Sequence, residues 1–248
     1  MNGFFGMKTE WVLIFLFIVP LSLWTYQRNA VWDSEIGLWK DCVRKAPMKE
    51  RTHHNLGFVY YELGLSDDAK REFEEALRLT PDYALSFYNL GLVYYKKGLL
   101  AEAVNHYTKA IELDPTFSNS YYNLGLAYHC QRRYPEAIWA YEELLRLNPN
   151  YENAYNRLGL AYKELRQWKK AVQAFRQELN QHPNNFSAHL YLGETYMELK
   201  DTSNALSHFQ KALEYPPFTE DEKTRKMVLK LEADRKEKKA TSKERLRD

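Results

Sequence analysis

The sequence has few of the residues that carry covalent or metal chemistry. Its two cysteines, Cys42 and Cys130, stand in a chain of 248 residues and share no CxxC spacing. Two cysteines cannot build a disulfide framework, so we expect both to be small buried thiols. The formal net charge is only +2, which gives no reason to expect a nucleic-acid partner.

Catalytic motifs are also lacking. The chain contains no nucleophile motif, phosphate-binding loop or zinc signature. His53 and His54 are adjacent, so on a helix their side chains would point about 100° apart and could not easily share a metal ion. We therefore expect no enzyme activity, no catalytic residue, no metal site and no cofactor.

Glycine and proline are scarce, at 10 and 9 residues, but their placement is regular. A 34-residue period places glycine, a small alanine twelve residues later and proline at fixed intervals in five successive copies. The glycines are Gly57, Gly91, Gly125, Gly159 and Gly193. The alanines are Ala69, Ala103, Ala137, Ala171 and Ala205. The prolines are Pro81, Pro115, Pro149 and Pro183, with Pro217 closing the fifth copy.

This pattern resembles the tetratricopeptide repeat (TPR), in which each unit of 34 residues is a helical hairpin. The resemblance implies an all-α fold, a TPR solenoid of helix-turn-helix hairpins, and we expect one N-terminal transmembrane helix in addition. Glycine and alanine would let the two helices of a hairpin approach closely, and proline would end the second helix. The expected divisions are an N-terminal flank (1–10), a transmembrane anchor (11–27), a capping half-repeat helix (28–49), five repeats (50–83, 84–117, 118–151, 152–185 and 186–218), a C-terminal capping helix (219–239) and a basic tail (240–248).

The fourth repeat departs most from the pattern. Glu178 and Gln181 stand where the other copies have alanine or leucine. We expect looser packing between the fourth and fifth repeats.

An uncharged apolar run from Trp11 to Tyr26 precedes the repeats. The 19 residues between Lys8 and Arg28 would measure about 28 Å as a helix, close to the thickness of a bilayer core. A cleaved signal peptide is the alternative, but no small-x-small cleavage site follows Val19. A buried core helix is disfavoured because the run is apolar on all sides. We predict a single-pass membrane anchor.

The side of the membrane on which the repeats lie is less constrained. Basic residues just after the run, Arg28 and Lys40 among them, favour a cytoplasmic array. The family resemblance given below implies an extracytoplasmic array, in the periplasm or a lumen, and this is the side we favour.

The resemblance to TPR proteins also implies a binding face. In such repeats the first helix of each hairpin lines a concave surface that recognises peptides or partner helices. The position of a residue within its 34-residue repeat, which we call its phase, tells which residues of this chain would lie on that surface. The expected protein- or peptide-binding residues are His54, Asn55, Tyr88, Asn89, Tyr95, Tyr122, Asn123 and Arg157. The recurring Asn55, Asn89 and Asn123 could form a ladder that pairs with a peptide backbone, or could only tie neighbouring first helices together.

Two functions follow from these observations. The first is a membrane-anchored scaffold for protein–protein interactions. The second rests on residues 25–57, TYQRNAVWDSEIGLWKDCVRKAPMKERTHHNLG, which resemble the junction between the last membrane helix and the repeats in bacterial TPR membrane proteins related to the transmembrane and TPR-containing O-mannosyltransferases. That resemblance implies the non-catalytic, acceptor-binding arm of a truncated membrane glycosyltransferase.

Overall fold

The computed structural model describes Leu21 and residues 34–214 and 222–244, and all the regular elements within these residues are helices. The chain divides into two compact units between Lys97 and Gly98, which are described separately. Among the described residues, no helix is long and apolar enough to cross a membrane. The predicted anchor, 11–27, lies outside the described residues except for Leu21.

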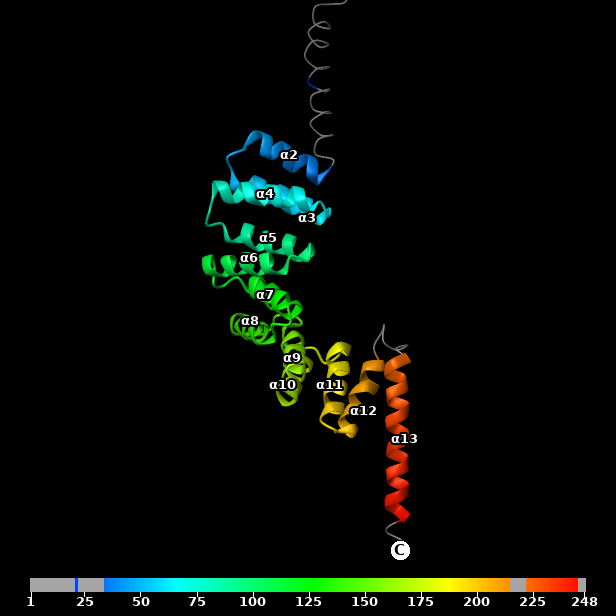
Figure 1. Cartoon of the computed structure of the whole chain (residues 1–248). Helices are drawn as coiled ribbons and strands as arrows, with labels where there is room; N and C mark the ends of the chain where they lie inside the picture. The colour runs from blue at the N-terminus through cyan, green and yellow to red at the C-terminus, as the bar shows by residue number, and fades with distance from the viewer. Residues whose placement is uncertain (1–20, 22–33, 215–221, 245–248) are drawn as a thin grey trace, which may run out of the picture. The chain divides into compact units, whose positions relative to one another are not determined.

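Unit 1 contains four described helices (Figure 1), and each of them packs on the next in sequence. They are α2 (Glu35–Lys45), α3 (Glu50–Glu62), α4 (Ser66–Leu79) and α5 (Ala84–Lys96). α3 also contacts α5, so the first helices of successive hairpins are neighbours. Ala69, Phe73, Leu90 and Val93 form the buried centre of this unit.

The helix α2 occupies the segment expected to hold a capping half-repeat. Its first turn is capped, because the Gly37 backbone N–H donates to Ser34 Oγ at 3.1 Å. Asp41 accepts from Arg44 and Lys45 on the following turn, and these bonds lower the pKa of the Asp41 carboxyl to about 2. α2 packs against α3 and thereby covers the start of the first hairpin.

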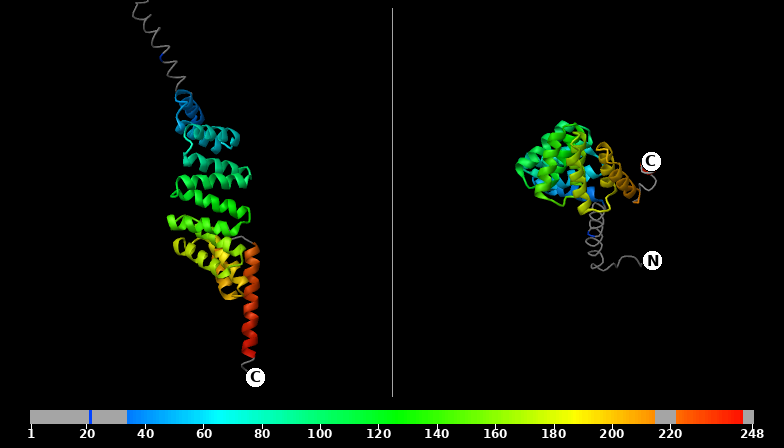
Figure 2. Two further views of the ribbon diagram at one scale, coloured as in Figure 1. Left: turned by 60° about the vertical axis from the view of Figure 1, so that its left-hand side comes forward. Right: turned by 90° about the horizontal axis from the view of Figure 1, so that it is seen from below.

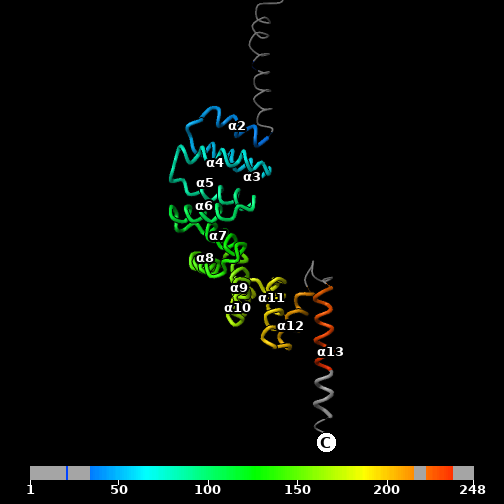
Figure 3. Tube along the Cα trace, viewed as in Figure 1, coloured from blue at the N-terminus to red at the C-terminus, as the bar shows by residue number. Residues whose placement is uncertain are grey.

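Unit 2 contains eight described helices, which are followed along the chain in Figure 2 and in the tube of Figure 3. They are α6 (Leu100–Leu113), α7 (Ser118–Cys130), α8 (Tyr134–Leu147), α9 (Ala154–Glu164), α10 (Trp168–Gln181), α11 (Phe186–Glu198), α12 (Thr202–Leu213) and α13 (Glu222–Glu244). Each packs on its successor, and α9 contacts both α7 and α11. The first helices α7, α9 and α11 therefore form one layer.

In the hairpins α3–α4, α7–α8, α9–α10 and α11–α12, a ring of the second helix lies on a glycine of the first. Phe175 is fully buried, and a Cβ added to Gly159 would lie 2.5 Å from its ring. Phe209 lies in the same way on Gly193, again at 2.5 Å. Only a residue without a side chain leaves room for the ring, so the period of glycine and aromatic residues has a direct steric cause.

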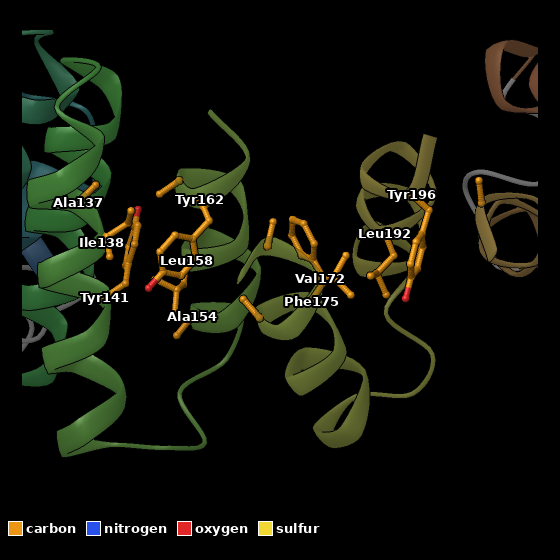
Figure 4. Close-up of a cluster of buried hydrophobic side chains, with 14 of the residues drawn as sticks. Ala137, Ile138, Tyr141, Ala154, Leu158, Tyr162, Val172, Phe175, Leu192 and Tyr196 are labelled. Carbon is orange, nitrogen blue, oxygen red and sulfur yellow. The ribbon is translucent and has the colours of Figure 1, made fainter. Parts of the chain in front are cut away.

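The same contact repeats through the core of unit 2. Tyr141, Phe175 and Phe209 are buried together with Tyr121 of α7 and with leucines and alanines from α8 to α13 in one cluster. Figure 4 shows Tyr141, Leu158, Phe175 and Leu192 filling the space between successive hairpins. A hairpin of this unit thus buries its apolar side only against its neighbours, which makes its stability depend on them. The all-α class and the helix-turn-helix hairpins are confirmed.

The C-terminal helix differs from the sequence-based expectation. It continues to Glu244, beyond residue 239 where we placed its end, because no glycine or proline interrupts residues 240–244. The expected start at Thr219 lies outside the described residues. Val228 and Leu231 are buried against the rest of unit 2, and Gln210 Nε2 of α12 donates to Glu232 Oε1 at 2.9 Å.

The expectation of two buried cysteines is wrong for Cys130. This residue is exposed because it is the last of α7, where the helix leaves the core, and Cys42 is half-buried. The two cysteines are not joined in a disulfide.

The turn inside each hairpin uses one left-handed residue, again at 34-residue spacing. It is glycine at Gly64 (φ 76°) and Gly98 (φ 75°). The three later copies have Arg132 (φ 60°), Arg166 (φ 55°) and Lys200 (φ 60°) at the same place. A non-glycine residue in this conformation costs roughly 1 kcal/mol or more, so these turns are held by the helices that they join.

Candidate functional site

His54 and Asn89, two residues expected to face a partner, lie inside unit 1. Their side chains are only 6% and 4% exposed. His54 Nδ1 lies 3.2 Å from Ser86 Oγ, and its Nε2 accepts from Asn89 Nδ2 at 3.4 Å. Both contacts join α3 to α5. For this pair the structure therefore supports the alternative in which the polar side chains tie neighbouring first helices together.

The surroundings of His54 keep its ring neutral. The ring lies 5.6 Å from Phe73 and 5.3 Å from Tyr83, measured between ring centroids. Burial among these rings lowers the pKa of His54 to about 4. Asn55, Tyr88 and Tyr95, the other expected binding residues of unit 1, are half-buried.

Asn123 behaves differently from Asn89, although the two have the same phase. It is half-buried on α7, and its Nδ2 donates to the backbone carbonyl of Asn119 one turn earlier at 3.0 Å. The three asparagines with this phase thus have unlike environments. Periodicity in the sequence does not make them equivalent, because each takes its partner from its own surroundings.

Tyr122 and Arg157 stand in a cluster of aromatic rings in unit 2. The Tyr122 ring lies 5.1 Å from Tyr151 and 6.3 Å from Tyr141. The Tyr151 hydroxyl donates to Asn119 Oδ1 at 2.9 Å, which joins the turn before α9 to α7. These contacts fix the rings on rigid helices, so the surface is organised before any partner arrives.

Arg157 is an exposed cation beside these rings. Burial lowers its pKa, but its hydrogen bond with Tyr122 and the neighbouring phenols of Tyr141 and Tyr191 outweigh that effect, so the pKa of Arg157 is raised. Its guanidinium group therefore stays charged and presents N–H donors to the surroundings.

The sequence reasoning missed two residues on α11. Glu194 forms an ion pair with Lys163 of α9, and the Lys163 ammonium lies 5.6 Å from the centre of the Tyr191 ring. The Tyr191 ring in turn lies 5.5 Å from Phe175. Tyr191 and Glu194 occupy the same positions in the fifth repeat as Asn55 and Phe58 in the first. Applying the same repeat positions to the fifth repeat would therefore have identified them.

These contacts define one surface of unit 2, which we call the α7–α9–α11 face. It contains Asn119, Tyr122, Arg157, Lys163, Tyr191 and Glu194. Tyrosine and arginine are the residues on which binding energy concentrates in protein interfaces. Among the residues that the structure describes, no group of three or more His, Cys, Asp or Glu side chains is placed to hold a metal ion.

Family models for the tetratricopeptide repeat match most of the region that these hairpins occupy. One, described as a TPR repeat, matches residues 67–98, 93–132 and 131–166. A second, described as a tetratricopeptide repeat, matches residues 156–218. The chain belongs to the TPR proteins.

Solved structures agree with this assignment. A crystal structure of the protein MamA is 30% identical in sequence, with a TM-score of 0.62, and the match covers 64% of this TPR chain and 93% of MamA. YrrB, described as a TPR protein with an unusual peptide-binding site, is 21% identical with a TM-score of 0.65, over 72% of this chain and 92% of YrrB. At that identity YrrB supports the fold alone.

A curated relative is a protein O-mannosyl-transferase of Caenorhabditis elegans, 33% identical over 76 residues. The match covers 31% of this TPR chain but only 11% of the relative. The similarity is consistent with the resemblance to TPR-containing O-mannosyltransferases, and it covers a small part of the relative.

Proposed function

We propose that this chain is a protein-interaction scaffold that binds a polypeptide partner on the α7–α9–α11 face. The observation that carries the proposal is the cluster of Tyr122, Tyr151 and Arg157, in which an exposed cation is held beside ordered rings. Such a cluster offers large aromatic contact area at little entropic cost, together with charged donors for a partner's carbonyl or carboxylate oxygens. The peptide-binding site reported for YrrB is an example of this fold in the same role.

The proposal includes a non-catalytic role. The glycines, alanines and rings that recur with the period are used for packing between helices, and on the α7–α9–α11 face Tyr151 pairs with Asn119 and Lys163 with Glu194. Binding energy is therefore the quantity that this surface can supply.

The test of the face is a crosslinking pull-down with the full chain. We expect the double substitution Tyr122→Ala and Arg157→Ala to reduce recovery of the specific partner at least about tenfold, since hot-spot residues of these types cost about 2 kcal/mol or more each. Substituting Gln173 and Gln177 by alanine, both exposed on α10 of the other helix layer, is the matched control and should leave recovery unchanged. Equal recovery with both double variants would exclude this face.

We further propose that residues 11–27 anchor the chain in a membrane as a single span, with the repeats on the extracytoplasmic side. The support is the apolar run between Lys8 and Arg28 and its length. An alkaline phosphatase fused to the C-terminus is expected to be active in cells, because this enzyme matures only after export. An inactive fusion that is nevertheless present at normal abundance would place the repeats in the cytoplasm.

A second candidate is the acceptor-binding arm of a membrane glycosyltransferase, which the similarity to the O-mannosyl-transferase favours. In that case the same face would hold the polypeptide to be modified. The DNA upstream of the first codon discriminates between the candidates: a continuous frame encoding further hydrophobic spans supports the arm, and an in-frame stop codon leaves the scaffold.

A further inference from the structure

The junction between α10 and α11 replaces two apolar positions of the repeat by polar residues. Glu178 stands where the other repeats have Ala76, Ala110, Leu144 and Ala212. Seven residues later, Asn185 stands where three preceding repeats have Tyr83, Phe117 and Tyr151. Glu178 lies in the last turn of α10 and Asn185 directly precedes α11, so both changes fall at the same junction.

A pocket of about 680 Å³ lies at this junction, and Glu152, Asn153, Glu178, His182, Asn184 and Asn185 form part of its wall. The expected looser packing between the fourth and fifth repeats stays a prediction, because α10 packs on α11 as α8 packs on α9. The position of the pocket is set by helix ends, since α10 ends at Gln181 and α11 begins at Phe186.

Glu178 brings a buried acceptor to this wall. Its side chain is fully buried, and its Oε1 accepts from His182 Nδ1 at 3.0 Å and from Asn185 Nδ2 at 2.9 Å. Its Oε2 is also buried and has no hydrogen-bond partner among the described residues. A buried carboxylate oxygen without a donor is unfavourable, so this atom is suited to accept from a ligand.

The charge of the wall selects the kind of ligand. Glu152 and Glu178 are acidic, and no lysine or arginine lines the pocket. The carboxyl end of α10 at Gln181 adds a partial negative charge. The positive end of α11 is already occupied, because Asn185 Oδ1 accepts from the Ala188 backbone N–H at 3.2 Å. A cation with N–H donors fits these groups and an anion does not.

We infer that this pocket binds the ammonium group of a lysine side chain from a partner polypeptide. A single unpartnered oxygen suits a point donor better than the two-pronged guanidinium group of arginine. The pocket also adjoins the proposed binding face: Asn153 directly precedes α9 and Ser187 lies in the first turn of α11, and Arg157 and Tyr191 follow about one turn later. A chain crossing that face can place one lysine in the pocket. The inference rests on the proposed function, because it names the chemistry of the same partner.

The pocket can be tested with a small probe and the full chain in detergent micelles, labelled with ¹⁵N-asparagine. Nα-acetyl-lysine amide is expected to shift the side-chain signals of Asn184 and Asn185, both in the wall. Its Nε-acetylated form has similar length but no charge and should leave them in place. Glu178→Gln keeps the shape and the acceptor of Oε1, and should weaken binding about tenfold or more. Equal shifts from both probes, or equal affinity in the variant, would overturn the inference.

A second variant guards against misfolding of the first. Asn185→Tyr restores the ring found at Tyr83 and Tyr151 and places it in the pocket wall beside Glu178, so it should strongly reduce the shifts of Asn184 while Glu178 remains. Retained binding in this variant would also overturn the inference. Glycine amide, whose ammonium is an amino terminus, separates a lysine side chain from a chain end: shifts as large as those with the lysine probe would assign the pocket to amino termini and contradict the proposal.

The two proposals fail independently. If the double variant of Tyr122 and Arg157 loses the partner but the chain does not bind the lysine probe, the proposed scaffold function stands and only the lysine pocket is refuted. If the chain binds the lysine probe through Glu178 but the double variant recovers the partner normally, the pocket stands. The α7–α9–α11 face is then refuted as the binding site, together with its proposed connection to the pocket.

Discussion

Replacing Phe175 by alanine is expected to destabilise unit 2 by about 3 to 5 kcal/mol, the usual cost of removing a fully buried ring. Phe175 is 0% exposed, lies on Gly159 within its own hairpin and contacts Tyr191 of the next. Its removal therefore weakens one hairpin and the boundary to the next together. Urea unfolding followed by circular dichroism measures the total loss, and hydrogen exchange of α9–α11 locates it.

The contact between Phe175 and Gly159 can be isolated by a double-mutant cycle. Gly159→Ala alone should cost about 1 to 3 kcal/mol, because the new methyl group would meet the ring. In the Phe175→Ala background the same change has space and should cost nothing or stabilise. Trp139→Ala, which removes a ring that is 49% exposed, is the control and should have a much smaller effect. Additive losses in the cycle would contradict the contact.

Acidification from pH 7 to pH 4 is expected to lower the stability of unit 1 by on the order of 3 kcal/mol through His54. Burial lowers the pKa of this residue from 6.5 to about 4, so the folded chain binds fewer protons than the unfolded chain between these values. The stabilising contribution is complete above pH 6.5 and is lost as the pH falls toward 4.

Hydrogen exchange of peptides from α3 and α5, corrected for the intrinsic pH dependence of exchange, measures this effect within unit 1. His54→Gln removes the titrating group and keeps donors and acceptors for Ser86 and Asn89, so the local stability of this variant should change much less with pH. Unit 2 has its own acid-sensitive residue, since burial and the adjacent His189 lower the pKa of His208 to about 4; its response should be the same in both proteins. An unaltered pH slope in α3 and α5 of the variant would exclude His54 as the cause.

Most of the hairpin architecture follows from the sequence, because its determinants are local and periodic. The spacing between Gly159 and Phe175 predicts that the two helices approach closely, and the ring of Phe175 does lie on Gly159. Pro183 is expected to end the second helix, and it lies in the turn after α10. The extended end of α13 was missed because no residue there stops a helix, and the absence of a stop signal is weak evidence in either direction.

The candidate site was predictable only in part. His54 and Asn89 carry the correct phase for a binding face but turn toward each other, since two polar groups at neighbouring first helices can satisfy one another. The Lys163–Glu194 pair depends on two helices whose separation no local pattern encodes. The position within the repeat predicts where a residue lies on its helix. Whether the side chain is buried, and what it binds, depends on the side chains of the adjoining helix.

The left-handed turn residues of the later hairpins have a consequence for the electric field around unit 2. Arg132, Arg166 and Lys200 occupy a conformation that glycine adopts more easily, and all three are exposed cations. Turns within successive hairpins fall on one edge of the stack, whereas the turns between hairpins, which include the acidic pocket wall, fall on the other. Arg132 and Arg166 therefore place positive charge at the first of these edges of unit 2, where it would attract an acidic segment of an approaching polypeptide before contact is made.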